Sequence, residues 1–133
     1  MSALIEGFKK EHSEIIATLN EVEELSILSR EGQAKLVSVK ASLLEHLWNE
    51  DEQLYPVLRK EAEHNKKLKE ILDVFANDTE NIYGDMLEFF GKYTEGATDS
   101  KFKGAFEHLF AALRTRIRNE ENFLYDEYEK MNQ

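Results

Sequence analysis

Four long stretches of this sequence place apolar residues three and four positions apart, and the chain contains few residues that favour turns. This spacing gathers the apolar side chains on one face of a helix. The predicted helices cover residues from about 3 to 28, 33 to 56, 62 to 93 and 101 to 130. Ser2 is the predicted N-cap of the first helix, and Pro56 should kink or end the second.

Short connections make consecutive helices antiparallel neighbours. The expected fold is therefore all-α, an up-down-up-down antiparallel four-helix bundle, with residues 1–133 forming a single domain. The clearest predicted loop is the segment TEGATDS, residues 94–100, which is rich in turn and capping residues. In bundles of this kind, metal and cofactor sites lie between facing helices.

Charge and composition exclude several classes of function. A net charge of −10 argues against a nucleic-acid partner and against binding to anionic membranes. The chain has no cysteine, which excludes disulfides, thiolate metal sites and a cysteine nucleophile. Its N-terminal segment contains no long apolar run, so neither a signal peptide nor a membrane anchor is expected. We therefore expect a cytoplasmic protein.

The segment LLEHLWNEDEQLYPVL, residues 43–58, places an imidazole and a carboxylate on an apolar helix face. His46 and Glu50 are four residues apart, so they lie one turn above the other on the face that carries the leucines of this segment. Burying an ionised carboxylate is costly unless it is paired or binds a metal. A cation held jointly with His46 is one way to keep Glu50 in the core.

A second segment, LRTRIRNEENFLYDEY, repeats the first one seventy residues later. The matching pairs include Leu43 and Leu113, Glu50 and Glu120, and Tyr55 and Tyr125. The one ligand-type position that does not match is His46, whose counterpart is Arg116. The repeat suggests that the first and second pairs of helices are related by an approximate two-fold axis.

Two further histidines are predicted on the core faces of the remaining helices. His12 lies in the apolar stripe of the first helix, and His64 lies near the start of the third. In an antiparallel bundle, the starts of helices one and three come near the ends of helices two and four. We therefore expect one layer of the bundle to contain the following residues: His12, His46, Glu50, His64, Arg116 and Glu120.

At this point the sequence resembles the hemerythrin-like, or HHE cation-binding, family. Four motifs carry the resemblance, one in each predicted helix: FKKEHSEI, HLWNEDEQLYP, EHNKKLKEIL and RIRNEENFLY. The resemblance implies a carboxylate-bridged di-iron site, with O2 binding, O2 or iron sensing, or iron handling, and no enzymatic turnover of an organic substrate. It matches Glu50 and Glu120 to the bridging carboxylates. It matches three histidines to terminal ligands: His12, His46 and His64.

Arg116 departs from the family pattern, which has a histidine at this place in the fourth helix. A guanidinium is always protonated and has no lone pair to give to a metal. Three imidazoles and two carboxylates suit one divalent ion of iron, zinc or manganese, and they are few for two irons. The expected cofactor is thus one or two iron ions, with zinc or manganese as alternatives, and the expected partners are the metal, O2 and another protein.

A metal-free bundle is the alternative interpretation. Arg116 could bridge Glu120 and Glu50 across the bundle through a bidentate guanidinium, which would satisfy both carboxylates without a metal. The histidines would then be hydrogen-bonded core residues. Such a protein would act as a protein–protein interaction or regulatory module.

Overall fold

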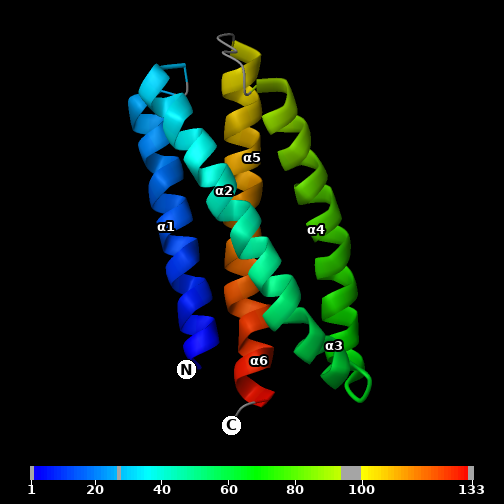
Figure 1. Ribbon diagram of the computed structural model, residues 1–133. Coiled ribbons are helices and arrows are strands. Elements are labelled where there is room, and N and C mark those ends of the chain that lie inside the picture. The colour runs from blue at the N-terminus through cyan, green and yellow to red at the C-terminus, as the bar shows by residue number, and fades with distance from the viewer. Residues whose placement is uncertain (1, 27, 94–99, 132–133) are drawn as a thin grey trace.

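The computed structural model describes residues 2–26, 28–93 and 100–131, which are helical throughout except at short turns and contain no strand. The elements are α1 (Ala3–Leu25), α2 (Arg30–Gln53), α3 (Tyr55–Ala62), α4 (Lys66–Tyr93), α5 (Ser100–Asn119), the π-helical turn η1 (Glu120–Leu124) and α6 (Tyr125–Met131). Figure 1 shows α1 running up, α2 and α3 down, α4 up, and α5 to α6 down. The predicted up-down-up-down four-helix bundle is confirmed.

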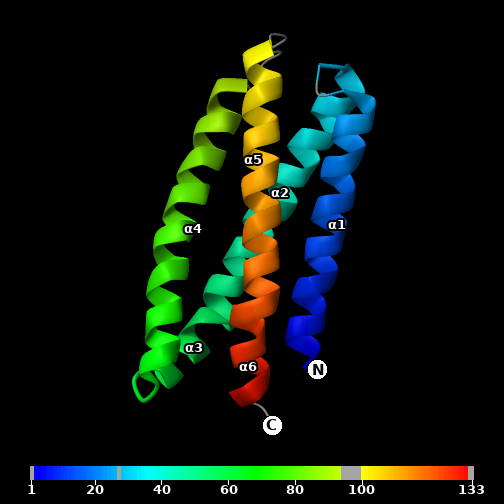
Figure 2. The ribbon, with the colours of Figure 1, turned by 180° about the vertical axis from the view of Figure 1, so that it is seen from behind.

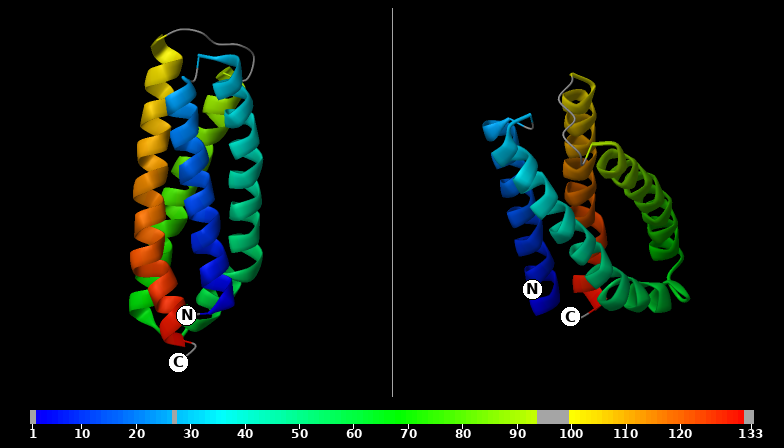
Figure 3. Two further views of the ribbon diagram at one scale, coloured as in Figure 1. Left: turned by 90° about the vertical axis from the view of Figure 1, so that its left-hand side faces the viewer. Right: turned by 45° about the horizontal axis from the view of Figure 1, so that its top comes forward.

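The N- and C-terminal ends of the chain lie at the same end of the bundle, where α3 bends away from the axis of α2 (Figures 2 and 3). The bend follows from the sequence. Leu54 interrupts the helix, and Pro56 lies in the first turn of α3, where its missing N–H leaves no helical hydrogen bond unmade. None of the described helices is both long and apolar enough to span a membrane.

The predicted helix boundaries agree with the structure at some ends and differ at others. Ser2 caps α1, because its side chain accepts a hydrogen bond from the backbone N–H of Ile5 at 3.3 Å. α2 and α3 together extend past the predicted end of the second helix, and α4 begins at Lys66, later than predicted. Most of the loop predicted at 94–100 lies outside the described residues.

A buried polar layer separates two apolar clusters along the bundle. The cluster nearer the α1–α2 turn contains residues such as Leu19, Leu36, Phe89 and Phe106. The cluster at the opposite end contains Ile5, Leu58, Leu68, Leu124 and others. Between them lie five polar or charged side chains that are no more than 5 % exposed: His12, His46, Glu50, Arg116 and Glu120. The fold thus places all five in a single region of low dielectric.

Candidate metal centre

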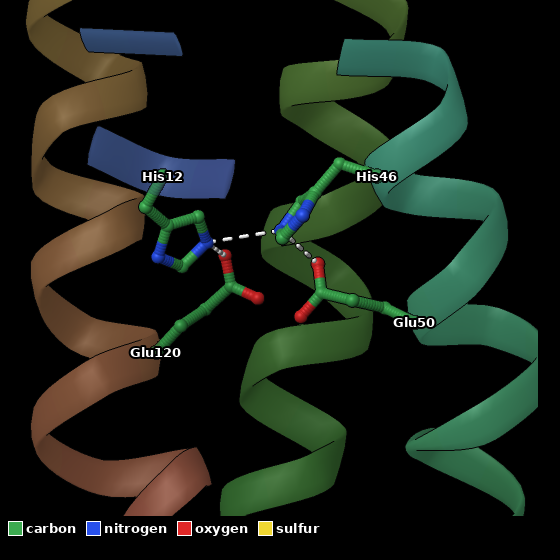
Figure 4. Close-up of side chains that lie close together, drawn as sticks. All are labelled: His12, His46, Glu50 and Glu120. Carbon is green, nitrogen blue, oxygen red and sulfur yellow. Dashed lines mark hydrogen bonds and ion pairs between the residues drawn. The ribbon is translucent and has the colours of Figure 1, made fainter. Parts of the chain in front are cut away.

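Four side chains of the polar layer converge on one point (Figure 4). His12 comes from α1, His46 and Glu50 come from α2, and Glu120 is the first residue of η1. Each offers one donor atom, and the four donor atoms lie within 4.8 Å of one another. We refer to these four residues as the His/Glu cluster.

The shortest distances within the His/Glu cluster match those between ligands of a single metal ion. Nε2 of His46 lies 2.9 Å from Nε2 of His12 and 2.9 Å from Oε1 of Glu50. Nε2 of His12 lies 3.7 Å from Oε1 of Glu120. Donors about 2.1 Å from one ion lie roughly 2.9 to 3.5 Å apart, depending on the angle at the metal. A movement that brings the more distant donors, such as those of His12 and Glu120, closer together would let the cluster surround one ion.

The outer nitrogens of both imidazoles face carboxylates. Nδ1 of His12 lies 2.8 Å from Oε2 of Glu121, and Nδ1 of His46 lies 2.6 Å from Oε1 of Glu11. An ionised carboxylate can only accept, so each Nδ1 carries the hydrogen and donates it. The two Nε2 atoms then present lone pairs to each other across 2.9 Å. Two facing lone pairs repel each other, and a metal ion between the nitrogens would turn this repulsion into coordination.

Burial controls the protonation of the cluster. It lowers the pKa of His12 to about 4, although the nearby carboxylate of Glu120 opposes the shift. Burial raises the pKa of Glu50, and hydrogen bonding to Tyr125 is among the effects that oppose the rise. Burial and then the negative charge of Glu50 raise the pKa of Glu120 well above its ordinary value. The layer is therefore short of positive charge, a condition that a metal ion corrects.

One atom of the cluster has no partner. Oε2 of Glu120 is buried and accepts no hydrogen bond. An unsatisfied buried carboxylate oxygen costs free energy and calls for an explanation. A metal ion bound to Glu120 would satisfy this oxygen, so the residues present fit a metal.

Tyr125 completes the inner surface on this side of the layer. Its hydroxyl donates to Oε2 of Glu50 at 3.0 Å and lies 3.2 Å from Nε2 of His12. Tyr125 is the first residue of α6, directly after the π-helical turn that begins with Glu120. The π-helical turn therefore supplies a cluster carboxylate, and the residue directly after it supplies the tyrosine that supports Glu50.

Arg116 lies in the same layer but points to the other side, toward α4. Its Nη1 donates to the carbonyl oxygen of Phe75 at 3.1 Å and to Oδ2 of Asp78 at 3.0 Å. Its Nη2 donates to the hydroxyl of Tyr55 at 2.9 Å and to Oγ1 of Thr79. The metal-free alternative predicts that Arg116 bridges Glu120 and Glu50. Arg116 makes an ion pair with Glu120, where its Nε lies 3.6 Å from Oε1, but its terminal nitrogens contact α4 and α3 in place of Glu50.

The structure brings four of the five predicted ligands together and leaves out His64. The prediction that His64 lies on a core face is wrong, since it is exposed in the turn between α3 and α4. The reason is the position of the helix start. Asn65 caps α4 by accepting a hydrogen bond from the N–H of Leu68 at 3.1 Å, so His64 precedes the helix and has no place on its buried face.

Sequence reasoning missed the carboxylates that hold the two imidazoles, Glu11 and Glu121. Each is adjacent in sequence to a cluster residue, but neighbouring residues on a helix do not share a face, so the adjacency carried little signal. It also missed Asp78 and Thr79, which receive the guanidinium of Arg116. The spacing of apolar residues in α4 does not distinguish these two positions from other polar positions of the helix.

Comparison with protein families agrees with this geometry. Residues 3–128 match the hemerythrin HHE cation-binding domain, which is nearly the whole chain. Neither curated proteins nor solved structures give a significant match. With its four-helix bundle and a buried His/Glu cluster placed to hold a metal ion, the chain belongs to the hemerythrin HHE cation-binding domain family.

Proposed function

We propose that this protein binds a non-haem iron ion at the His/Glu cluster and acts in sensing or handling O2 or iron, without turnover of an organic substrate. The single observation that carries the proposal is the pair of imidazoles whose Nε2 atoms face each other. Nε2 of His12 and Nε2 of His46 are 2.9 Å apart, while both Nδ1 atoms are engaged by carboxylates. A metal ion between the two Nε2 atoms uses both lone pairs at once.

The charge balance of the layer supports the same proposal. Glu50 and Glu120 contribute two buried carboxylates against the one guanidinium of Arg116, which leaves an excess of negative charge. In the absence of a metal, a proton must supply part of the compensation, as the raised pKa values of both carboxyl groups indicate. A divalent ion would take the place of that proton.

The donor set narrows the choice of metal. Two imidazole nitrogens and two carboxylate oxygens suit iron, zinc and manganese, and they offer no soft sulfur ligand. Membership of the hemerythrin HHE family supports iron among these. When bound, iron would supply reversible one-electron chemistry and an affinity for O2.

A small cavity beside the cluster supports a role for O2. It has a volume of about 30 Å³ and lies against His12, His46, Arg116 and Glu120. Its other walls are mostly apolar: Ile15, Leu43, Leu47, Ile82, Met86, Leu113 and Ile117. A space of this size can hold a water molecule or a diatomic gas. The apolar walls favour a neutral gas over an ion.

Metal analysis with matched histidine variants tests this function. Protein purified from iron-supplied cells should contain iron, and a chelator should lower its midpoint of thermal unfolding, because a ligand that binds the native state stabilises it. His46→Ala should abolish both effects. His64→Ala and His108→Ala serve as controls, since both side chains are exposed and should leave both effects unchanged. Wild-type protein without metal, and indifferent to chelator, would rule the proposal out.

The alternative function is a metal-free module that contacts another protein. The observation that favours it is the buried guanidinium of Arg116, a cation already present in the layer. Exposed aromatic side chains such as Trp48, which is 62 % exposed, could then serve a protein partner. The chelator experiment separates the two functions, because a metal-free module keeps the same unfolding midpoint with and without chelator.

A further inference from the structure

Arg116 and His46 hold equivalent positions in the two halves of the repeat and point into opposite halves of the polar layer. His46 turns toward α1, where it meets His12 and Glu11. Arg116 turns toward α4, where it meets Phe75 and Thr79. The layer therefore has two cation positions, one on each side of its centre.

The guanidinium is surrounded by oxygen atoms, as a cation in a prepared site would be. Its two terminal nitrogens make four hydrogen bonds, to the Phe75 carbonyl, Asp78, Tyr55 and Thr79. Its Nε lies 3.6 Å from Oε1 of Glu120, and its Cζ lies 4.7 Å from the centre of the Phe75 ring. The N–H donors of both terminal nitrogens are thus used, and the Nε–Glu120 contact adds an ion pair, so Arg116 is a fixed part of the layer.

Glu120 faces both cation positions. The same oxygen, Oε1, lies 3.7 Å from Nε2 of His12 and 3.6 Å from Nε of Arg116. On the α4 side, however, the described residues offer no buried imidazole or carboxylate besides Glu120, and the group of possible metal ligands is confined to α1, α2 and η1. A second metal ion would lack nitrogen ligands there and would lie beside a positive charge.

Building on the metal binding proposed above, we propose that the guanidinium of Arg116 occupies the second cation position, so that the protein holds one metal ion, a divalent one, at the His/Glu cluster. Glu120 would then lie between the metal ion on one side and the guanidinium of Arg116 on the other. The repeat explains the arrangement, because it places His46 at one position and Arg116 at the other.

Stoichiometry is the direct test, with Co2+ as an optical probe that does not depend on O2. Titration of the metal-free protein should reach its end point at one Co2+ per chain. The double substitution Arg116→His with Thr79→His removes the guanidinium and places an imidazole on α4 at the position that now contacts it. This variant should bind two Co2+ ions per chain, with circular dichroism and urea unfolding showing that it is folded.

A second variant covers the case in which the double variant does not fold. Arg116→Met keeps the length of the side chain and removes its charge, so it should still bind one Co2+ but severalfold more tightly, because a repelling charge has gone. The affinity is best measured at a pH high enough to ionise Glu120. A matched control is Arg118→Met, which removes a guanidinium two positions away that is not part of the buried layer.

The outcomes separate this inference from the proposed function. If no form of the protein binds metal, the proposed function itself fails. If wild-type protein binds two ions, metal binding stands but the role of Arg116 is wrong. The role of Arg116 is equally wrong if the folded double variant still binds one ion, or if Arg116→Met leaves the affinity unchanged.

Discussion

Glu121 accepts a hydrogen bond from Nδ1 of His12 at 2.8 Å, and this contact determines which nitrogen of the ring faces the centre of the bundle. Glu11 does the same for His46 at 2.6 Å. Both carboxylates are partly exposed, whereas both imidazoles are buried. Carboxylates that accept from the outer nitrogen of a ligand histidine fix its tautomer and raise its basicity.

We expect Glu121→Ala and Glu11→Ala each to weaken metal binding by about 10- to 100-fold, as removal of such outer partners does elsewhere. Competition against a chelator of known affinity measures the change. Glu45→Ala is the matched control, because Glu45 is exposed and adjacent to His46. Glu121→Gln, whose amide oxygen still accepts a hydrogen bond, should fall between wild type and Glu121→Ala. Equal affinities in all four variants would mean that the two contacts have no role in binding.

Glu50→Gln should stabilise the metal-free protein while abolishing metal binding. Burial raises the pKa of Glu50, so its ionised form opposes folding near neutral pH. Replacing it with a neutral amide also removes its repulsion of Glu120, and the expected gain in unfolding free energy is roughly 1 kcal/mol. The hydroxyl of Tyr125 can still donate to the amide oxygen.

Urea unfolding of wild type and Glu50→Gln, both with excess chelator, measures this gain. An acid whose pKa is raised by folding loses stability as the pH rises from its unfolded pKa to its folded pKa. The advantage of Gln should therefore disappear below the pKa of an unfolded glutamate, about 4.3. If the metal-free alternative is correct, Glu50→Gln should instead lower the unfolding free energy at neutral pH, because Glu50 would then be a needed partner of Arg116.

Much of the fold and most of the cluster could be predicted from the sequence. The helical spacing of apolar residues predicted the bundle, and a histidine four residues before a glutamate predicted that His46 and Glu50 share one face. The repeat at seventy residues identified Glu120. These predictions succeeded because each depends on periodicity within one helix, which the sequence displays directly.

Periodicity within one helix does not determine where a helix begins or which way a long side chain points. His64 was assigned to a core face because the cap at Asn65 was not recognised. The direction of Arg116 depends on acceptors in another helix, among them Asp78 and Thr79, which no local pattern connects to it. The contact of His12 with Glu121 could not be predicted for the same reason, because the two residues are distant in sequence and no local pattern connects them.

Metal binding should release a proton near neutral pH and become tighter as the pH rises. Burial and the charge of Glu50 raise the pKa of Glu120, so the metal must displace a proton held by this carboxylate pair. The pKa of His12 is lowered to about 4, so this imidazole is already neutral and does not contribute to the release. Calorimetric titration in buffers of different ionisation enthalpy counts the protons released.

Glu120→Gln is the companion to that measurement. This variant lacks the carboxyl group whose pKa is raised by burial and by Glu50, so fewer protons should be released with whatever metal still binds. A release that is the same in wild type and Glu120→Gln would show that the proton comes from another group.

The two tyrosines matched by the repeat should have different roles. The hydroxyl of Tyr125 contacts Glu50 and His12, whereas the hydroxyl of Tyr55 accepts a hydrogen bond from Arg116. Tyr125→Phe should therefore weaken metal binding, because Glu50 loses the donor that orients it, while the aromatic ring can keep its stacking on His12, with ring centroids 5.5 Å apart. Tyr55→Phe should leave the metal affinity unchanged and lower the unfolding free energy by about 1 kcal/mol.

Metal titration and urea unfolding of the two variants, run side by side, make each the control for the other. Both substitutions remove one buried hydroxyl from the residue that follows an interruption in a helix, so their effects on packing should be similar. A loss of metal affinity confined to Tyr125→Phe would place the ion on the His12 and His46 side of the layer. Equal losses in both variants would instead mean that the ion contacts both sides, in conflict with a guanidinium fixed at the second position.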